Sequence, residues 1–396
     1  MSKMVFIGSV YPTGLIQKLL NRKEHIDFAA NTFQRSLLEG LCNCYNDITV
    51  ITSPVTTHYP KSNTKAYSRT VFKEVIGREL RLVFPGFWNF PLIKMFTEFF
   101  NVKRVLNYEL LDKTDVFVYA LHTPFLYATY KLRKRIPHIC VIVPDIPEYM
   151  SSNKGLLRWM MKRLNRVILD KCLKVCDSFV LLSPYMKDHL PIGDKPWVQV
   201  EGIYVDLSSY ESPTKYREKT LLYSGIISSK YGVFDLIEAF MQIDDPDFKL
   251  LLCGSCQSEL TSLKELIGRD SRIQYLGMLT MDEVRKLQRE VTLLVNPRHS
   301  HEEFTKYSFP SKTMEYLASG TPTLMCHLPA IPKEYDNHLF YFNDESIKGM
   351  RDKIIEICSM SSNVLREHGM RARQFIVEEK NAYKQAQKVF DMIYHQ

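Results

Sequence analysis

The feature that most constrains the fold is an alternation of short apolar segments with amphipathic segments, which recurs in both halves of the chain. Val5–Val10 and Ile48–Ser53 have the composition of β-strands, and Ala29–Leu41 between them carries apolar residues at helical spacing. The second half repeats the pattern with a strand at Thr220–Ser224, a glycine-containing turn and a helix at Val233–Gln242. Such an alternation predicts parallel sheets with crossover helices. We therefore expect an α/β fold with two doubly wound domains facing across a cleft.

The length of 396 residues is too great for one average domain and suits two, each large enough to bury a core of its own. Across Pro191–Lys219 the pattern gives way to Gly, Pro, Ser and charged residues, which is typical of a linker. We place the first domain at residues 1–198, the linker at 199–218 and the second domain at 219–378. Residues 379–396 are expected to form a final helix.

Composition argues against several classes of protein. The nine cysteines are scattered without partners at ligand spacing, so we expect reduced core thiols rather than a zinc site. The N-terminal apolar run is too short for a signal peptide, and no segment approaches the roughly 18 apolar residues of a membrane-spanning helix. The net charge of +8 suits an anionic ligand or a membrane surface, and no motif supports nucleic-acid binding. We expect a cytoplasmic protein, either free or peripheral on the cytoplasmic face of the membrane.

The most informative segment is Asn296–Pro322, which reads NPRHSHEEFTKYSFPSKTMEYLASGTP. An apolar strand precedes it, Ser308 and Ser311 are natural N-caps, and Gly320 ends the helix that follows. The segment therefore predicts a polar loop that leads into a helix N-terminus.

A helix N-terminus presents unpaired backbone N–H groups and a partial positive charge, so it can bind an anion. Arg298, Lys306 and Lys312 would add formal charge for a phosphate, and Glu315 could accept hydrogen bonds from a hydroxyl-rich ligand. The alternative is a surface helix whose basic residues are solvated and whose Glu315 balances the helix dipole. The residues alone leave these two interpretations level.

The motifs NPR, FPSK and MEYLASGTP in this segment resemble the nucleotide-sugar signature of glycosyltransferase family 4, which has the GT-B fold of two Rossmann-like domains. Glu315 matches the second of the family's two glutamates, and Phe309 matches its phenylalanine. The first glutamate falls on Tyr307, where this chain departs from the family pattern. Glu302 and Glu303 lie just upstream and are candidates to replace it in space. The resemblance also implies that the last helix packs against the first domain.

A second motif carries the same resemblance. Gly225 with Lys230 looks like the family's phosphate loop, in which a glycine lets backbone N–H groups reach a diphosphate and a lysine neutralises it. The family's arginine after that glycine is Ile226 here, so Arg298 is the candidate for that charge. The next strand of this half also ends at a glycine, Gly254.

Two candidate site residues lie in the first half. Polar residues just past the carboxyl ends of parallel strands line the crevice where ligands bind in open α/β sheets. His122 follows a strand at Asp115–Ala120, and Asp145 follows a strand at His138–Val143. The resembled family often has a histidine where this chain has Pro144. A role for Asp145 is therefore a hypothesis, and a simple turn is the alternative.

Two segments of the first half could form a lipid surface. Arg78–Leu111 carries aromatic residues that are interrupted by Pro and Gly and flanked by basic residues, which suits a core or a surface entering a lipid headgroup layer. We favour a core by roughly two to one. Gly155–Cys176 predicts a long helix with a cationic stripe of Arg158, Lys162 and Arg166, for which a solvated face is favoured over a membrane surface.

Taken as a whole, the resemblance implies a retaining, hexosyltransferase-type glycosyltransferase that moves a sugar from a nucleotide diphosphate donor to a lipid-linked saccharide in capsule or exopolysaccharide biosynthesis. A soluble acceptor is an alternative. The expected donor-binding residues are Gly225, Lys230, Gly254, Arg298, Glu303, Tyr307, Ser308, Phe309, Ser311, Lys312 and Glu315.

We expect Glu315 on the ribose, and Lys230 with the other cations on the diphosphate. Asp145, His122 and Lys230 are the expected catalytic groups. No cofactor and no metal is expected, since the acidic segment 244–247 suits a capped turn better than a metal-binding DxD motif. Two other classes stay open, namely a sugar-nucleotide epimerase of the same fold and a non-catalytic subunit that binds a nucleotide sugar.

Overall fold

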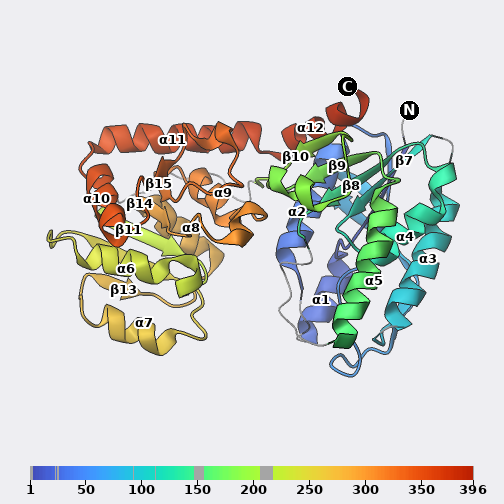
Figure 1. Ribbon diagram of the computed structural model, residues 1–396, viewed down its shortest axis with the longest axis horizontal. Coiled ribbons are helices and arrows are strands. Elements are labelled where there is room, and N and C mark those ends of the chain that lie inside the picture. Colours follow the sequence, from blue (N-terminus) through green and yellow to red (C-terminus); the bar gives the residue numbers. More distant parts are fainter. Residues whose placement is uncertain are drawn as a thin grey trace. The chain divides into compact units, whose positions relative to one another are not determined.

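The computed structural model describes residues 3–22, 24, 26–91, 93–111, 113–146, 156–205 and 217–395, without the side chains of 156–159 and 161. Its contacts divide the chain into two compact units (Figure 1). The first unit comprises Met1–Val205 with Asn381–Gln396, and the second comprises Asp206–Lys380. Each unit has a sheet and a core of its own. Most of the expected linker lies outside the described residues.

The first unit is built on an eight-stranded sheet with the order β10-β9-β8-β7-β1-β2-β5-β4. Neighbouring strands are parallel except for β4, which pairs antiparallel with β5. The central strand β1 places Val5 opposite Thr49 of β2 and Val116 of β7. The strands of this sheet are β1 (Lys3–Gly8), β2 (Asp47–Thr52), β4 (Thr70–Ile76), β5 (Arg78–Phe84), β7 (Thr114–Tyr119), β8 (Ile139–Val143), β9 (Ser178–Leu181) and β10 (Trp197–Gln199). A separate antiparallel pair joins β3 (Ala66–Tyr67) to β6 (Phe87–Trp88).

Helices cover both faces of this sheet, as right-handed crossovers from a central strand require. Helices α3, α4 and α5 pack side by side on one face, and α2 packs with the C-terminal helix α12 on the other (Figure 1). A Cβ on Gly40 of α2 would lie 2.0 Å from the carbonyl oxygen of Ala382, so only a glycine allows this close packing. The helices of the first unit are α1 (Thr13–Asn21), α2 (Phe28–Leu41), α3 (Ile93–Glu109), α4 (Thr123–Lys131), α5 (Leu156–Leu173) and α12 (Ala382–Tyr394).

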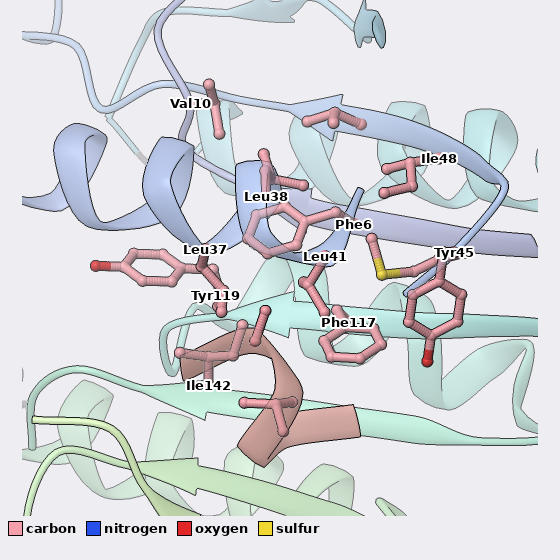
Figure 2. Packing of buried hydrophobic residues seen from close by; sticks show 14 of the residues in the cluster. Phe6, Val10, Leu37, Leu38, Leu41, Tyr45, Ile48, Phe117, Tyr119 and Ile142 are labelled. Carbon is pink, nitrogen blue, oxygen red and sulfur yellow. The ribbon is translucent and has the colours of Figure 1, made fainter. Parts of the chain in front are cut away.

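The core on the α2 side joins residues that lie far apart in the sequence. Phe6 of β1 and Phe117 of β7 pack against Leu37 and Leu41 of α2, and Figure 2 shows these side chains gathered between the helix and the sheet. Val389 brings α12 into the same cluster. The C-terminal helix is thus part of the hydrophobic core of the first unit.

The second unit is a six-stranded parallel sheet with the order β13-β12-β11-β14-β15-β16. Apolar strands alternate with helices as the sequence pattern requires, and Leu222, Leu251 and Leu294 meet in its core. The strands are β11 (Arg217–Ser224), β12 (Lys249–Cys253), β13 (Ile273–Tyr275), β14 (Val291–Asn296), β15 (Thr323–Met325) and β16 (Phe340–Tyr341). The helices are α6 (Val233–Met241), α7 (Leu260–Ile267), α8 (Met281–Glu290), α9 (Ser311–Ala318), α10 (Ile347–Cys358) and α11 (Ser362–Glu379).

The expected α/β class, with two doubly wound sheets, is confirmed. The sequence analysis missed the β4–β5 hairpin, which turns at Gly77 with a φ of +67°. The expectation of a core for the aromatic segment is right for Phe84 and Phe87, which are buried. It is wrong for Phe96 and Phe100, which lie on the outward side of α3. The buried aromatic residues of this segment thus belong to β5 and β6, whereas those of α3 lie on its exposed side.

Two further expectations concern the whole chain. All nine cysteines are free, and Cys140, Cys253 and Cys326 are among those that are buried. Across the part of the chain that the structure describes, no helix has the length and apolar character needed to cross a membrane. Of the expected cationic stripe on α5, the side chain of Arg158 lies outside the description, and Arg166 forms an ion pair with Asp170 on the same helix at 2.8 Å.

Candidate functional site

Glycines lie at the carboxyl ends of two neighbouring strands of the second unit. Gly225 follows β11 and Gly254 follows β12, and a Cβ on Gly254 would lie 1.8 Å from the carbonyl oxygen of Gly225. Gly254 also has a φ of +128°, which side-chain-bearing residues rarely adopt. The N–H group of Gly254 donates to the carbonyl oxygen of Gly277 at 2.8 Å. These glycines let three strand ends approach one another, and the hydroxyl groups of Tyr223 and Tyr275 lie against them.

Lys230 and Arg298 lie over the same aromatic ring, in the loops that follow β11 and β14. The Nζ atom of Lys230 lies 4.8 Å from the centre of the Phe304 ring, and the guanidinium carbon of Arg298 lies 5.3 Å from the same centre. Arg298 also stacks on Tyr231 at 4.9 Å. Within the described residues neither Lys230 nor Arg298 forms an ion pair with a carboxylate. An aromatic ring attracts a cation but carries no formal negative charge. Lys230 and Arg298 therefore both remain positively charged and can bind an anion.

The guanidinium group of Arg298 is held in a desolvated position. Its Nε atom is buried and has no hydrogen-bond partner among the described residues. Burial lowers the pKa of Arg298, and the neighbouring Tyr231 and Tyr223 oppose that shift. An arginine remains charged at neutral pH even so. A buried cationic donor without an acceptor among the described residues leaves hydrogen-bonding capacity for a ligand.

The loop that carries Arg298 is fixed on both sides. A Cβ on Gly232, the N-cap of α6, would lie 2.1 Å from the carbonyl oxygen of Pro297, so the loop lies directly against the helix start. His299 contacts Asp235 of α6 through Nε2 at 2.6 Å and Glu345 through Nδ1 at 3.3 Å. The backbone conformation that presents Arg298 is therefore set before any ligand binds.

One group of side chains near this loop could hold a metal ion. The ligand atoms of His299, His301 and Glu345 all lie within 4.8 Å of one another. Glu345 accepts from the N–H group of Ser300 at 3.0 Å. Desolvation raises the pKa of Glu345, but hydrogen bonds from Ser300 and the charge of His299 outweigh it and give a lowered pKa. The contact between His299 and Asp235 gives the group a structural role without any metal.

The acidic segment 244–247 is a turn, as the sequence favoured. The N–H group of Asp247 donates to the carboxylate of Asp245 at 2.9 Å, and Lys219 binds that carboxylate at 2.6 Å. The segment links the end of α6 to the start of β12, whereas Gly254 marks the other end of that strand.

The start of α9 differs from the expectation that a serine caps it. Pro310 occupies the N-cap position and no side chain caps the helix. Ser311 is already the first helical residue, and the hydroxyl group of Ser308 donates to the carbonyl oxygen of Phe304 at 3.0 Å. The prediction of Ser308 and Ser311 as N-caps is wrong because proline's fixed φ already favours the turn into the helix.

Lys312 and Glu315, expected on different parts of a donor, bind each other at 2.9 Å. Both side chains are partly exposed, so this pair contributes only about 0.2–1 kcal/mol and a ligand can replace it. The first turn of α9 contains no acidic residue, which excludes the interpretation of Glu315 as a first-turn dipole residue.

Tyr307, which stands where the resembled family has a glutamate, contacts one of the candidate replacements. Its hydroxyl group lies 3.2 Å from Oε1 of Glu303, and Glu303 also binds Lys306 at 3.2 Å. The carboxylate of Glu303 is thus brought to the tip of the Tyr307 side chain. Phe309 is buried, and the centre of its ring lies 5.6 Å from that of Tyr335. This contact holds the loop before α9 in place.

The structure adds positioning residues that the sequence analysis did not identify. The hydroxyl group of Tyr316 in α9 accepts from the backbone N–H of Ser224 at 2.8 Å and is fully buried. It fastens α9 to the end of β11 beside Gly225. Phe304 and His299 are the others, and their only sequence signal was their place within the motif-bearing segment.

In the first unit, the partly exposed side chain of His122 lies beside the buried carboxylate of Glu98. Its Nε2 atom lies 3.5 Å from Oε2 of Glu98, and Lys94 lies one turn before Glu98 in α3. Desolvation lowers the pKa of His122, partly offset by Glu98, which favours the neutral imidazole. Its buried Nδ1 has no hydrogen-bond partner among the described residues. Sequence analysis missed Glu98 and Lys94 because both lie within the aromatic helix.

Asp145 lies past the end of β8, the strand next to β7. Desolvation, with a smaller effect of Asp27, raises the pKa of this carboxyl group although the residue is exposed. The structure records no hydrogen bond or ion pair between Asp145 and His122 in the described part of the first unit. The segment 147–155 that follows lies outside the described residues.

Comparison with solved structures defines the class of the fold. Sucrose-phosphate synthase from Thermosynechococcus elongatus aligns with a TM-score of 0.63 at 13% identity, over 99% of this chain and 99% of that one. HepE from Anabaena in complex with UDP gives a TM-score of 0.63 at 12% identity over 100% of both chains. An α,α-trehalose-phosphate synthase from Burkholderia xenovorans gives 0.60 at 10% identity, over 99% of this chain and 100% of that one. The chain therefore has the GT-B fold of these glycosyltransferases.

The family comparison is more specific for the second unit. Residues 218–360 match the family described as glycosyl transferases group 1, which places the glycines, the cation pair and α9 inside the matched segment. The second unit is thus a glycosyltransferase group 1 domain. A search of curated protein sequences found no match.

Proposed function

We propose that this protein is a retaining glycosyltransferase of family 4 that transfers a sugar, of the hexose type, from a nucleotide diphosphate donor to an acceptor hydroxyl group. The observation that carries the proposal is the cation pair of Lys230 and Arg298 on the ring of Phe304, in the group 1 domain. A diphosphate is the anion that such a pair suits, because two cations can each bind one phosphate group. The complex of the Anabaena HepE structure with UDP supports a nucleotide donor.

The leaving diphosphate is stabilised by charge. When the bond from the anomeric carbon to the phosphate oxygen breaks, negative charge develops on that oxygen. In the proposed complex Lys230, Arg298 and the uncapped start of α9 bind this charge. In the proposed complex the phosphates approach the backbone at Gly225 and Gly254, where no Cβ stands in the way. Because these groups are held before the ligand binds, little energy is spent on arranging them. We propose that this charge stabilisation replaces a catalytic metal.

The remaining donor contacts follow from the start of α9. In the proposed complex Glu315 leaves Lys312 and accepts hydrogen bonds from the ribose hydroxyl groups, while Lys312 turns to the diphosphate. Glu303, held by Tyr307, takes the place of the family's first glutamate at the sugar. Ser308, Phe309 and Ser311 shape the loop between them.

The acceptor side belongs to the first unit. We propose that His122 and Asp145, which follow neighbouring strands, bind the acceptor and the transferred sugar. In a retaining transfer the new bond forms on the face from which the diphosphate leaves, and the proton of the acceptor hydroxyl passes to a phosphate oxygen. The neutral imidazole of His122 can then orient the hydroxyl group by donating an N–H hydrogen bond to its oxygen. A lipid-linked saccharide of a capsule or exopolysaccharide pathway is the proposed acceptor, at the cytoplasmic face of a membrane.

Donor turnover with defined variants tests the proposal. The protein is incubated with a panel of nucleotide diphosphate sugars, with and without lipid-linked saccharide acceptors, and both the free nucleotide and the sugar product are measured. Lys230→Ala and Glu315→Ala are expected to abolish most of the transfer, whereas Lys264→Ala and Glu265→Ala on α7 are matched controls. If both site variants retain full activity, the donor site is elsewhere. Turnover of donor alone to an isomeric sugar would indicate an epimerase, and donor binding without turnover would indicate a non-catalytic subunit.

A further inference from the structure

The outward side of α3 in the first unit is apolar, although it faces solvent. Phe96 is 66% exposed, Phe100 62% and Ile93 50%. Their spacing of three and four residues places them on one side of the helix, opposite the buried Val102 and Val105. A protein surface rarely presents contiguous aromatic side chains to water unless they bind a partner.

The neighbouring helix α4 extends this surface. The ring of Phe99 lies 4.9 Å from that of Phe100 and 5.1 Å from that of Tyr127 on α4. Tyr127 stacks on Tyr130, and the Nζ atom of Lys131 lies 4.9 Å from the centre of the Tyr127 ring. The α3–α4 face consists of Ile93, Phe96, Phe99, Phe100, Tyr127, Tyr130 and Lys131. It combines phenylalanine with tyrosine and lysine, the residues that sit at a membrane–water boundary.

An arginine-lined cavity lies at the C-terminal end of the same helix. It has a volume of about 730 Å³, and its lining includes Arg69, Arg81, Arg104 and Arg135 together with Tyr108 of α3. Arg104 and Tyr108 follow Phe100 at intervals of four residues. The cavity is therefore continuous with the apolar stripe of the α3–α4 face.

The charge of this cavity is largely uncompensated. Arg81 binds Glu109 at 2.8 Å, and Arg135 donates to the carbonyl oxygen of Leu110 at 3.2 Å. Arg69 and Arg104 have no carboxylate partner within the described part of the chain. The only carboxylates of α3, Glu98 and Glu109, are both buried, so no acidic side chain of this helix faces outward.

We infer that the α3–α4 face docks on an anionic lipid bilayer, with Phe96 and Phe100 entering the boundary between headgroups and acyl chains and the arginine cavity receiving a phosphate-bearing headgroup. Exposed phenylalanine supplies the apolar contact and the arginines supply attraction to the anionic surface. The cavity is independent of the cation pair at Lys230 and Arg298, which belongs to the other unit.

A bilayer fits this face better than a second copy of the chain. In a symmetric dimer built on α3 the arginines would meet no exposed carboxylate of the partner's α3, because Glu98 and Glu109 are both buried. A bilayer offers apolar and anionic groups side by side, as the face requires. The inference deepens the proposed lipid-linked acceptor by naming the surface that would bring the protein to it, but docking needs neither donor nor acceptor.

Vesicle flotation tests the inference with the full-length chain. We would measure binding to phosphatidylcholine vesicles with and without phosphatidylglycerol, at low and high salt. The wild type is expected to float with the anionic vesicles and to be released by salt. Arg69→Gln/Arg104→Gln is expected to weaken binding about 25-fold, at about fivefold for each arginine. Phe96→Ser/Phe100→Ser is expected to abolish flotation. Matched controls in the second unit are Lys264→Gln/Arg269→Gln and Met278→Ser, whose side chains are exposed.

The outcomes separate docking from catalysis. Lys230→Ala is expected to float like the wild type even if it has no transferase activity, so failure of the proposed function leaves this result intact. Circular dichroism melting checks that the variants are folded, and the arginine variant tests the face if the phenylalanine variant unfolds. Flotation that is unchanged in both double variants, or absent in the wild type at low salt, would overturn the inference. A concentration-dependent dimer that only Phe96→Ser/Phe100→Ser disrupts would assign the face to a second copy instead.

Discussion

The Nε2 atom of His299 lies 2.6 Å from a carboxylate oxygen of Asp235, and this contact ties the loop after β14 to the first turn of α6. The residue before His299 is Arg298, which stacks on Tyr231 and Phe304. Lys230 precedes Tyr231 and lies over the same Phe304 ring. The loops that carry Lys230 and Arg298 are distant in sequence. The contact between His299 and Asp235 holds them side by side, with both cations over Phe304.

Removing the guanidinium group of Arg298 is expected to lower kcat/KM for the donor by about 10²- to 10³-fold, the usual effect of losing one preorganised donor to a developing negative charge. Arg298→Lys keeps a charge but loses the planar stack on Tyr231, so we expect it to recover only part of the activity. Steady-state kinetics measure both variants. Arg269→Ala, at an exposed arginine of the same unit, is the control, and equal losses in Arg269→Ala and Arg298→Ala would contradict the assigned role.

Asp235→Ala is expected to raise the donor KM by roughly tenfold with a smaller effect on kcat, because the loop that carries Arg298 loses its anchor but the cation itself remains. Asp235→Asn keeps an acceptor oxygen for His299 and should recover most of the affinity. Glu238→Ala on the same helix is the matched control. If Asp235→Asn and Asp235→Ala behave alike, the contact with His299 does not position the site.

Chelation tests the proposal that no metal acts on the leaving diphosphate. Donor turnover is expected to be unchanged after dialysis against EDTA, because Lys230, Arg298 and α9 supply the charge. If activity falls, His301→Ala identifies the source of the effect, since His301 belongs to the one group that could hold a metal among the described residues. Loss of activity on chelation that persists in His301→Ala would contradict a metal-free transfer.

Gly254→Ala is expected to destabilise the second unit by at least about 2 kcal/mol, from strain at a φ of +128° and from a Cβ placed 1.8 Å from the carbonyl oxygen of Gly225. Gly14 of α1 is the control position, because a Cβ there meets nothing within 4 Å. Gly14→Ala should be neutral or stabilising by up to about 1 kcal/mol. Urea denaturation compares the two variants, and similar midpoints would show that the contact at Gly254 relaxes freely.

The sequence predicts which segments form the candidate site more reliably than it predicts which side chains contact one another there. Strand periodicity and glycine turns are local signals, so both sheets and the segments around Gly225 and Arg298 could be predicted. That Phe304 joins Lys230 to Arg298 depends on the packing of two distant loops, which no local pattern reports. Lys312 and Glu315 are three residues apart on one helix, a spacing that predicts an ion pair. The family resemblance favoured ligand contacts for both residues, so the ion pair was not predicted.

The α3 helix shows a different limit. Its exposed side carries Phe96 and Phe100 while its buried side carries Lys94 and Glu98, so hydrophobic periodicity assigns the two sides wrongly. Only the sheet beneath it decides that Val102 is buried and Phe96 is not. The same applies to Glu98, which is buried beside His122, since a carboxylate within an aromatic helix would be placed outward by composition alone.

His368 on α11 gives the protein a pH-dependent stability. Its ring stacks on Phe340 at 4.2 Å, and desolvation, with a smaller effect of Arg371, lowers its pKa to about 4. The unfolded chain therefore binds this proton first as the pH falls below about 6.5, and stability decreases from there down to the folded pKa. We expect the wild type to lose on the order of 1–3 kcal/mol more than His368→Gln over this range. Urea denaturation at several pH values measures the difference, with His301→Gln as the exposed control, and parallel curves for wild type and His368→Gln would show that His368 is not the titrating group.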